Sequence, residues 1–286
     1  MKRFSINLFG LRAYLKLTWE SPEASRLRRG REFRKNNIYF EGDYPSWTAA
    51  LQAAGGYDSP QILEKAVSAM RQVRDGKAKY ERDTVVFDHV QLSYPLLSWL
   101  LYAASCSSSR LSVMDFGGAL GSSYCQNRVF LEQLSELRWG VVEQESFVTA
   151  GIAEFQTDTL HFFYAPDECV SALQSNFLLL SSVLQYIEHP LNLLDSLLEK
   201  DIPYVLIDRT MAHRLGPDRL AVQHVPAWIY KASYPVWFLD AAKLEQCFER
   251  HGYDVIDTFD PHVGATFGLE GFRAPYMGWF LKKRGS

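Results

Sequence analysis

A short glycine-rich segment is the first place in this sequence where residue types and spacing suggest chemistry. Its three glycines, in the pattern Asp-x-Gly-Gly-x-x-Gly, are Gly117, Gly118 and Gly121. Glycine lets the backbone approach a ligand closely, and the helix that we expect from Ser122 would present unpaired N–H groups to that ligand. The dinucleotide-binding pattern G-x-G-x-x-G would need its first glycine at Phe116. The segment therefore predicts a ligand-binding turn that does not follow the dinucleotide pattern.

Two acidic residues flank this turn. Asp115 precedes the glycines, and Glu143 ends the next apolar run, close to the offset of about 20 residues at which an acid binds ribose hydroxyls. A carboxylate can accept two hydrogen bonds from a diol. Asp115 would repel a pyrophosphate, whereas S-adenosylmethionine carries a sulfonium and an ammonium group and no phosphate. We therefore predict S-adenosylmethionine as the cofactor; the alternative for Glu143 alone is a solvated acid at a strand end.

A third segment, residues 178–190, continues this ligand-binding pattern. Its small residues at 181 and 182 would open space at the carboxyl end of a central strand, where open α/β sheets bind ligands. We expect Ser182 and Gln185 to lie near the cofactor. The alternative for the end of the segment is that Glu188-His-Pro190 only begins a helix, since proline is favoured in a first turn.

Candidate catalytic residues follow further along the chain. Asp208 could accept a proton from an acceptor hydroxyl, and Arg209 could orient a sugar or a phosphate. The alternative is an Asp–Arg pair that fixes a loop. His224 begins a segment rich in aromatic and polar residues that suits carbohydrate binding, and its side chain titrates near neutrality. A lone histidine is nevertheless more often structural.

Alternation of short apolar runs with helical stretches predicts an α/β fold with a mostly parallel sheet. Helices are expected at about 60–75, 91–106, 123–135, 146–156, 190–200 and 239–251. Strands are expected at 111–116, 139–143, 160–164, 177–183 and 204–208. Two last runs, at 253–259 and 277–282, have no clear helix between them and could pair as an antiparallel ending.

These segments together resemble a family of bacterial class I methyltransferases associated with surface-polysaccharide biosynthesis. The resemblance covers residues 39–283. It rests on Phe40-Glu-Gly-Asp-Tyr-Pro-Ser-Trp47, the stretches at 56–58, 81–83, 115–124, 139–144, 180–186 and 207–210, and Tyr230-Lys-Ala-Ser-Tyr-Pro235. It implies a Rossmann-like class I fold with a seven-stranded sheet and S-adenosyl-L-methionine as cofactor. It also adds Tyr124 and Gln144, which end two of the shared stretches, to the cofactor-binding residues, but it supplies no acceptor and no catalytic residue.

The resemblance and the candidate site predict O-methylation of a sugar, as a small molecule or a lipid-linked glycan. A non-catalytic S-adenosylmethionine-binding or scaffold protein remains an alternative, because a fold does not prove turnover. A nicotinamide-dependent oxidoreductase is a weaker alternative because of Phe116. The acidic body of the chain and the lack of a base-flipping motif lead us to expect no nucleic-acid partner.

The 286 residues divide into three expected parts. These are a basic arm at 1–40, a helical and loop extension at 41–106 packed on the core, and the cofactor-binding domain at 107–286. Residues 1–35 carry a net charge of +7 and the remainder -10. Apolar residues recur at helical spacing from Phe4 to Leu15, so the arm could lie on the inner membrane face as a basic amphipathic helix. The alternative is a flexible or body-packed arm.

The remaining features of composition favour a cytoplasmic protein. No run of residues is long and apolar enough for a membrane span, and we expect no signal peptide. The four cysteines are far apart and form no C-x-x-C pair, so we expect reduced thiols and no metal site.

Overall fold

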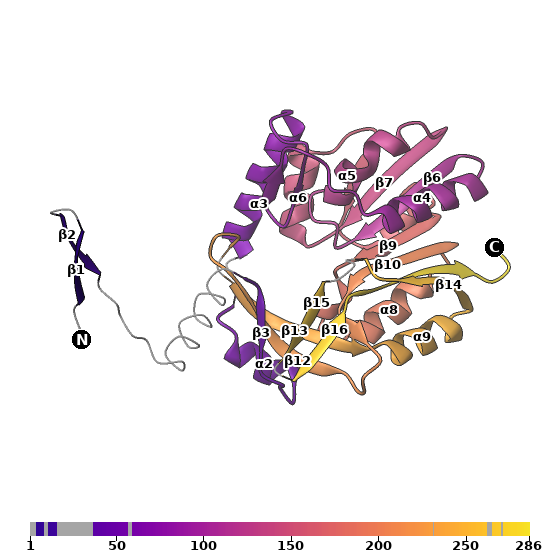
Figure 1. Cartoon of the computed structure of the whole chain (residues 1–286). Coiled ribbons are helices and arrows are strands. Elements are labelled where there is room, and N and C mark those ends of the chain that lie inside the picture. The colour runs from indigo at the N-terminus through magenta and orange to yellow at the C-terminus, as the bar shows by residue number, and fades with distance from the viewer. Residues whose placement is uncertain are drawn as a thin grey trace.

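The computed structural model describes residues 4–8, 11–15, 37–56, 59–230, 232–261, 265–269 and 271–286. A seven-stranded sheet forms the centre of the molecule (Figure 1). Its strands are β6 (Arg110–Phe116), β7 (Glu136–Val142), β8 (Leu160–Phe163), β9 (Phe177–Ser181), β10 (Tyr204–Thr210), β14 (Tyr253–Phe259) and β17 (Met277–Lys283). Each strand overlaps one of the expected apolar runs.

The strand order of this sheet defines the fold. The order is β14-β17-β10-β9-β6-β7-β8, and β6 to β10 pair in parallel with one another. β17 is antiparallel to both of its neighbours, β10 and β14. This is the order of the Rossmann-like class I methyltransferase fold, so the expected fold class and the expected antiparallel ending are both confirmed.

Helices cover both faces of the sheet, which explains why its strands are almost wholly apolar. On one face α3 (Ser59–Arg74), α4 (Tyr94–Cys106), α5 (Ser122–Leu131) and α6 (Glu145–Glu154) share a core with β6 and β7. On the other face α7 (Pro166–Leu173), α8 (Pro190–Leu198) and α9 (Ala241–Arg250) share a second core with β9 and β10. Every helix expected between residues 60 and 251 is present, whereas α7 and the short helix at Trp47–Ala53 were not expected.

A second sheet is formed by three strands from the segment between β10 and α9, with β3 from near the start of the described chain added at one edge. Its order is β11-β13-β12-β3, with β11 at Ala212–His213, β12 at Arg219–Val225, β13 at Ala232–Asp240 and β3 at Tyr39–Glu41. Helix α2 (Trp47–Ala53) packs on one face of this sheet, and the hairpin of β15 (Thr266–Leu269) and β16 (Phe272–Pro275) lies on the other face. β13 also packs against η1 (Leu184–Tyr186), the short 3-10 helix that follows β9. The insertion therefore stands at the carboxyl edge of the central sheet, where a ligand is expected.

A hairpin of β4 (Tyr80–Arg82) and β5 (Val85–Phe87) lies beside the helices that precede and follow β6. It packs against α3 and α5. The extension before β6 therefore brings residues 80–87 close to the start of α5, which follows the glycine turn.

The expected helix near the N-terminus is not found. Residues Phe4–Leu8 (β1) and Leu11–Leu15 (β2) form an antiparallel pair of strands. The apolar residues at 4, 6 and 8 also recur every second residue, which is strand spacing. The rest of the basic arm up to residue 36 lies outside the described residues. Within the described part of the chain, no helix has both the length and the apolar character to cross a bilayer.

Candidate active site

The turn after β6 is built around the carboxyl group of Asp115. The Asp115 side chain is 1% exposed, and its Oδ2 accepts a hydrogen bond from Trp139 Nε1 at 3.0 Å. Gly118 lies so close that a Cβ at this position would stand 2.5 Å from Oδ2. Burial raises the pKa of Asp115 to about 7, while the Trp139 N–H lowers it. Asp115 therefore supports the turn from within the protein.

The other two glycines are required for different reasons. Gly117 has φ +73° and Gly121 has φ +91°, in the left-handed region that favours glycine. A Cβ on Gly117 would stand 2.6 Å from Val183 Cγ2. The turn is thus pressed against the segment that follows β9, and it leads directly into α5.

Glu143 joins the end of β7 to the glycine turn. Its Oε2 accepts a hydrogen bond from the Gln144 backbone N–H at 2.7 Å. Burial raises the pKa of Glu143, whereas the backbone N–H groups of Gln144 and Ala119 favour its charged form. Ala119 belongs to the turn, so the two acids of the predicted cofactor site stand on either side of the glycines.

Ser182 and Gln185 connect β9 to β10. The Ser182 N–H donates to Asp208 O at 2.9 Å. The fully buried Gln185 donates through Nε2 to Ser182 Oγ at 3.1 Å and to Arg209 O at 3.2 Å. Gln185 Oε1 is buried and has no hydrogen-bond partner among the described residues. Both residues lie at the carboxyl ends of β9 and β10, and their hydrogen bonds hold the two strand ends together.

Tyr124 and Gln144 differ in their surroundings. Tyr124 is half-buried on α5, with its ring 5.9 Å from the ring of Trp139, the hydrogen-bond partner of Asp115. Gln144 is exposed and is the N-cap residue of α6. Tyr124 thus packs behind the turn, while Gln144 borders it beside Glu143.

Asp208 and Arg209 lie at the carboxyl end of β10 and share Ser181. Asp208 is 1% exposed, and its Oδ2 accepts a hydrogen bond from Ser181 Oγ at 2.9 Å. Arg209 Nε is 3.4 Å from the same Oδ2, and Arg209 also donates to Ser181 Oγ. The other carboxylate oxygen, Asp208 Oδ1, is buried without a hydrogen-bond partner in the described part of the chain. Because an unpaired buried acceptor is costly, this oxygen is available for a donor on a ligand.

A cavity of about 190 Å³ lies at the end of β10, and Asp208 is one of the residues that line it. Four segments line this cavity. The first is the hairpin of β4 and β5 together with the residues that lead into α4, and the others are α5, the end of β10, and the loop after β14. The lining residues are Arg82, Gln91, Leu92, Ser93, Leu96, Gln126, Asp208, Arg209 and Pro261. Asp208 and Arg209 therefore both line this cavity.

His224 does not share this position. It lies on β12, stacks on Tyr39 with ring centroids 4.5 Å apart, and has Nε2 at 3.5 Å from Glu41 Oε2. The neighbouring Gln223 instead contacts Tyr186 and Tyr234, and successive residues of a strand point to opposite faces. His224 thus belongs to the opposite face of the inserted sheet, and the geometry does not support its expected catalytic role.

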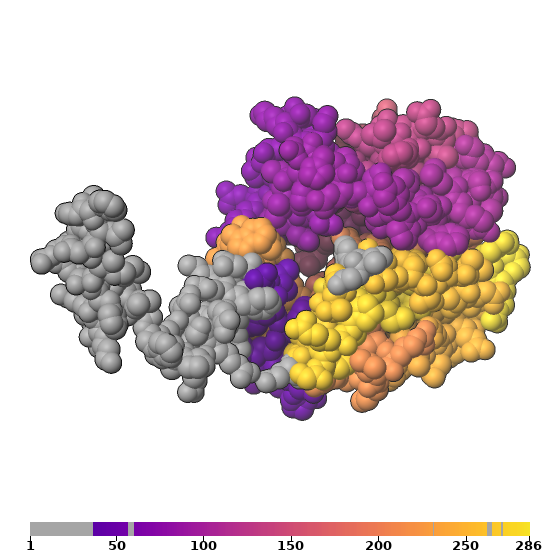
Figure 2. All heavy atoms as spheres, in the orientation of Figure 1, coloured from indigo at the N-terminus to yellow at the C-terminus, as the bar shows by residue number. Residues whose placement is uncertain are grey.

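Four tyrosines lie between the insertion and the central sheet. Tyr186, Tyr230, Tyr234 and Tyr276 are each partly exposed. Gln223 links two of them, since it accepts from Tyr186 Oη and donates to Tyr234 Oη, both at 3.1 Å. Figure 2 shows a hollow between the purple part of the chain that precedes β7 and the yellow C-terminal part. Burial raises the pKa of all four phenols, and the Asp83 carboxylate acts on each of them in the same direction.

Glu81 is a buried acid that we did not expect at this site. It is 4% exposed, accepts a hydrogen bond from Ser122 Oγ at the start of α5, and accepts another from the Thr84 N–H at 3.2 Å. Burial raises the pKa of Glu81 to about 7. Glu81 therefore ties the hairpin of β4 and β5 to the helix that begins after the glycine turn.

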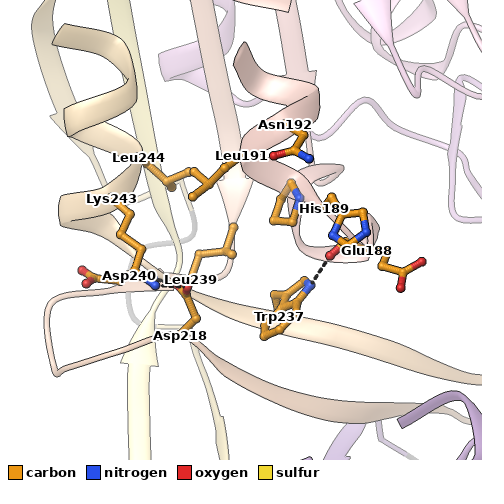
Figure 3. A pocket seen from close by; sticks show the side chains of 11 residues that line it. Glu188, His189, Leu191, Asn192, Asp218, Trp237, Leu239, Asp240, Lys243 and Leu244 are labelled. Atoms are coloured by element: carbon orange, nitrogen blue, oxygen red, sulfur yellow. Dashed lines mark hydrogen bonds and ion pairs between the residues drawn. The ribbon is translucent and has the colours of Figure 1, made fainter. Parts of the chain in front are cut away.

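A second cavity, of about 200 Å³, lies between α8 and α9 and is bordered by β13 (Figure 3). Trp237 Nε1 donates to Glu188 O at 3.3 Å across its rim. Asp218 pairs with Lys243 and accepts a hydrogen bond from the Asp240 N–H at 2.6 Å. The charges of Asp218 and Lys243 are thus already matched. His189 and Pro190 of the expected helix start line this cavity.

Comparison with known proteins gives only distant likenesses. No protein-family model matches the sequence, and no curated protein matches it at a significant level. The fold is similar to that of the 1,6-didemethyltoxoflavin-N1-methyltransferase of Burkholderia thailandensis, at 16% identity and TM-score 0.40, covering 80% of this chain and 94% of that one. It is also similar to magnesium protoporphyrin IX methyltransferase from Synechocystis PCC 6803, at 10% identity and TM-score 0.41, covering 77% and 97%.

A third similar structure is the N-terminal domain of EvdMO1 in the presence of S-adenosylhomocysteine and D-fucose, at 14% identity and TM-score 0.43, covering 80% of this chain and 98% of that one. At these low scores the likenesses carry no argument of their own. The assignment of the fold therefore rests on the strand order of this chain.

Proposed function

We propose that this chain is an S-adenosylmethionine-dependent methyltransferase. The observation that carries the proposal is the placement of Asp115 and Glu143 on either side of one glycine turn, in a sheet with class I methyltransferase strand order. Burial raises the pKa of both acids, and a cationic ligand at the turn would lower it again by favouring their charged forms. A pyrophosphate would instead be repelled by two acids beside the turn.

The residues of the turn fit this cofactor. Glu143 offers carboxylate oxygens to a ribose diol. Gly117 and Gly118 form a backbone cradle in which a side chain would collide with Val183 or Asp115. When bound, S-adenosylmethionine supplies an electrophilic methyl group on its sulfonium. The part of the protein is then to hold an acceptor in line and to take its proton.

Asp208 is the group that we propose for the proton. Asp208 lines the cavity at the end of β10, and its Oδ1 is buried without a partner among the described residues, so this oxygen can accept a hydrogen bond and then the proton of an acceptor hydroxyl. Ser181 and Arg209 hold Oδ2 and so fix the orientation of the carboxylate. Arg209 also balances its charge.

The acceptor that fits best is a sugar, free or linked to a surface glycan. The four tyrosines and Gln223 provide aromatic faces together with hydroxyl and amide groups, which is the composition that carbohydrate binding needs. This proposal extends the sequence resemblance to polysaccharide biosynthesis. It predicts that methyl transfer requires the insertion formed by β12 and β13.

Titration calorimetry with S-adenosylmethionine, S-adenosylhomocysteine and NADH tests the proposed cofactor. We expect the first two ligands to bind and NADH not to bind. Binding of NADH in place of S-adenosylmethionine would replace this proposal with an oxidoreductase. If the cofactor binds but no sugar in a panel of acceptors receives a labelled methyl group, the result favours the alternative of a non-catalytic S-adenosylmethionine-binding protein.

The basic arm carries a separate proposal. Its charge of +7 remains a reason to expect contact with anionic lipid at the inner membrane face. The helical stripe no longer supports this contact, because β1 and β2 are strands. Co-sedimentation with anionic liposomes, with and without residues 1–35, tests it. Equal pelleting of the two proteins would refute the role.

A further inference from the structure

We propose that the acceptor carries an anionic group, a phosphate or a carboxylate, which Arg82 and Arg209 bind together in the cavity at the end of β10. This inference rests on the proposed function, because it specifies the acceptor of the same site. It identifies Arg82, which the sequence did not single out, as a residue that determines specificity.

The first argument is the charge of the cavity lining. Two guanidinium groups, those of Arg82 and Arg209, line it, against the single carboxylate of Asp208. Glutamine side chains at 91 and 126 add neutral hydrogen-bonding groups. A cavity with this balance of charge has one uncompensated positive charge, which favours an anion.

The second argument is the state of Arg82. Its Nη2 donates to Gln91 Oε1 at 3.3 Å, and its guanidinium lies 5.7 Å from the centre of the Phe87 ring. Within the described residues, no carboxylate oxygen lies within 4.0 Å of its side-chain nitrogens. Guanidinium groups present several N–H donors in a planar fork that matches phosphate or carboxylate oxygens. Arg82 is held in place by contacts with the neutral Gln91 and Phe87, and no carboxylate of the described residues forms a direct ion pair with it.

The third argument comes from buried groups that lack partners. Asp208 and Ser93 both line the cavity, and their buried atoms Asp208 Oδ1 and Ser93 Oγ have no hydrogen-bond partner in the described part of the chain. Asp208 is 1% exposed, so a donor on a ligand is the natural partner of Oδ1. The cavity therefore suits a ligand that carries both a hydroxyl group and an anionic group. A phosphorylated or carboxylated sugar has both.

The size of the cavity is consistent with one such group. Its volume of about 190 Å³ is below the range of roughly 300–1,000 Å³ of complete ligand pockets. It can therefore hold the charged end of an acceptor whose remainder extends towards the tyrosines. Burial raises the pKa of Tyr276 and of Tyr80, and the charge of Arg209 opposes this effect on both phenols, as expected of groups on the same side of the site.

Another source of the same chemistry is the methionine carboxylate of the cofactor. The two sources separate in one experiment, in which inorganic phosphate is titrated into the full chain with and without saturating S-adenosylhomocysteine. An acceptor subsite binds phosphate in both conditions. A subsite for the methionine carboxylate loses phosphate when S-adenosylhomocysteine is present.

The variants for this experiment are Arg82→Gln, Arg82→Lys and a matched control, Arg138→Gln. Arg138 lies on β7 and pairs with Glu136, at the amino end of that strand. We expect Arg82→Gln to weaken phosphate binding at least tenfold and to leave S-adenosylhomocysteine affinity within twofold. Arg82→Lys should recover part of the phosphate affinity, and Arg138→Gln should match the parent.

Three results would overturn the inference. They are competition between phosphate and S-adenosylhomocysteine, equal phosphate affinity in Arg82→Gln and the parent, and no phosphate binding by a parent protein that binds S-adenosylhomocysteine. In the last case the proposed function stands without the inference. Failure of S-adenosylhomocysteine to bind at all would instead count against the proposed function. Thermal melting of each variant shows whether a loss of binding is caused by unfolding.

Discussion

Gly118 lies directly against the carboxyl group of Asp115, so close that a Cβ on Gly118 would stand 2.5 Å from Asp115 Oδ2. Unlike Gly117 and Gly121, Gly118 does not have a φ in the left-handed region. Space, and not backbone conformation, is therefore what requires glycine here. The same carboxyl group accepts the hydrogen bond of Trp139, which fixes it from the other side.

Replacing Gly118 by alanine should disturb the turn through this collision alone. We expect Gly118→Ala to lower the free energy of unfolding by about 1–3 kcal/mol, the usual cost of overpacking, and to weaken S-adenosylhomocysteine binding at least tenfold. Chemical denaturation and calorimetry measure the two effects. The control is Gly76→Ala, where φ is +72° but no atom lies within 4 Å of the new Cβ. It should lose some stability and keep its affinity. Unchanged affinity in Gly118→Ala would show that the turn does not hold the cofactor.

Replacing Asp208 by asparagine should separate chemistry from cofactor binding. Asparagine keeps the size of the side chain but cannot take a proton, so methyl transfer should fall at least about tenfold. Single-turnover transfer of a labelled methyl group to a sugar that the parent methylates measures this rate. Asp254→Asn, at an exposed ion pair with Arg284, is the control and should transfer at the parent rate. Equal rates in Asp208→Asn and the parent would remove Asp208 from the mechanism.

The buried acid Glu81 should make stability depend on pH. An unfolded glutamate ionises near pH 4, whereas burial raises the pKa of folded Glu81 to about 7. Between about pH 4 and pH 7 the unfolded chain binds fewer protons at Glu81 than the folded chain does. The contribution of Glu81 to the free energy of unfolding is therefore greatest at low pH and falls as the pH rises to about 7. Asp115, also with a pKa of about 7, acts in the same direction.

Glu81→Gln should remove the contribution of Glu81 to this slope. We expect its melting temperature, relative to that of the parent, to be higher at pH 8 than at pH 4.5. The exposed Glu249→Gln should follow the parent at both pH values. An identical pH dependence in Glu81→Gln and the parent would show that Glu81 is charged throughout this range.

The central sheet could be predicted from the sequence because its strands are buried on both faces. The run 177–181 is apolar up to its last residue. Apolar runs of this kind, separated by helical stretches, are typical of parallel sheets that are covered by helices on both faces. The glycine turn and its two acids were also predictable, since spacing along the chain determines their place at adjacent strand ends. Helix α7 was missed although Pro166 and two acids mark its first turn, because it has only eight residues.

The inserted sheet could not be predicted in the same way. Pro235 lies within β13, and proline normally argues against a strand. The structure accommodates Pro235 because β13 has a partner strand on only one side at this point. Pro235 pairs with Val222 of β12, whereas β11, on the other side of β13, pairs only with Leu239 and Asp240. The side to which His224 points depends on the register of β12, which the sequence does not state. Arg82 and Glu81 reach the site only through long-range packing of their hairpin against α5.

The most direct test of the account is calorimetric titration of S-adenosylmethionine into the parent, Glu143→Ala and Glu145→Ala. Glu143 adjoins the glycine turn, whereas Glu145 is an exposed residue in the first turn of α6 and serves as the control. We predict binding by the parent and by Glu145→Ala, and affinity at least tenfold weaker in Glu143→Ala. Failure of the folded parent to bind S-adenosylmethionine, or equal affinity in all three proteins, would contradict the central claim.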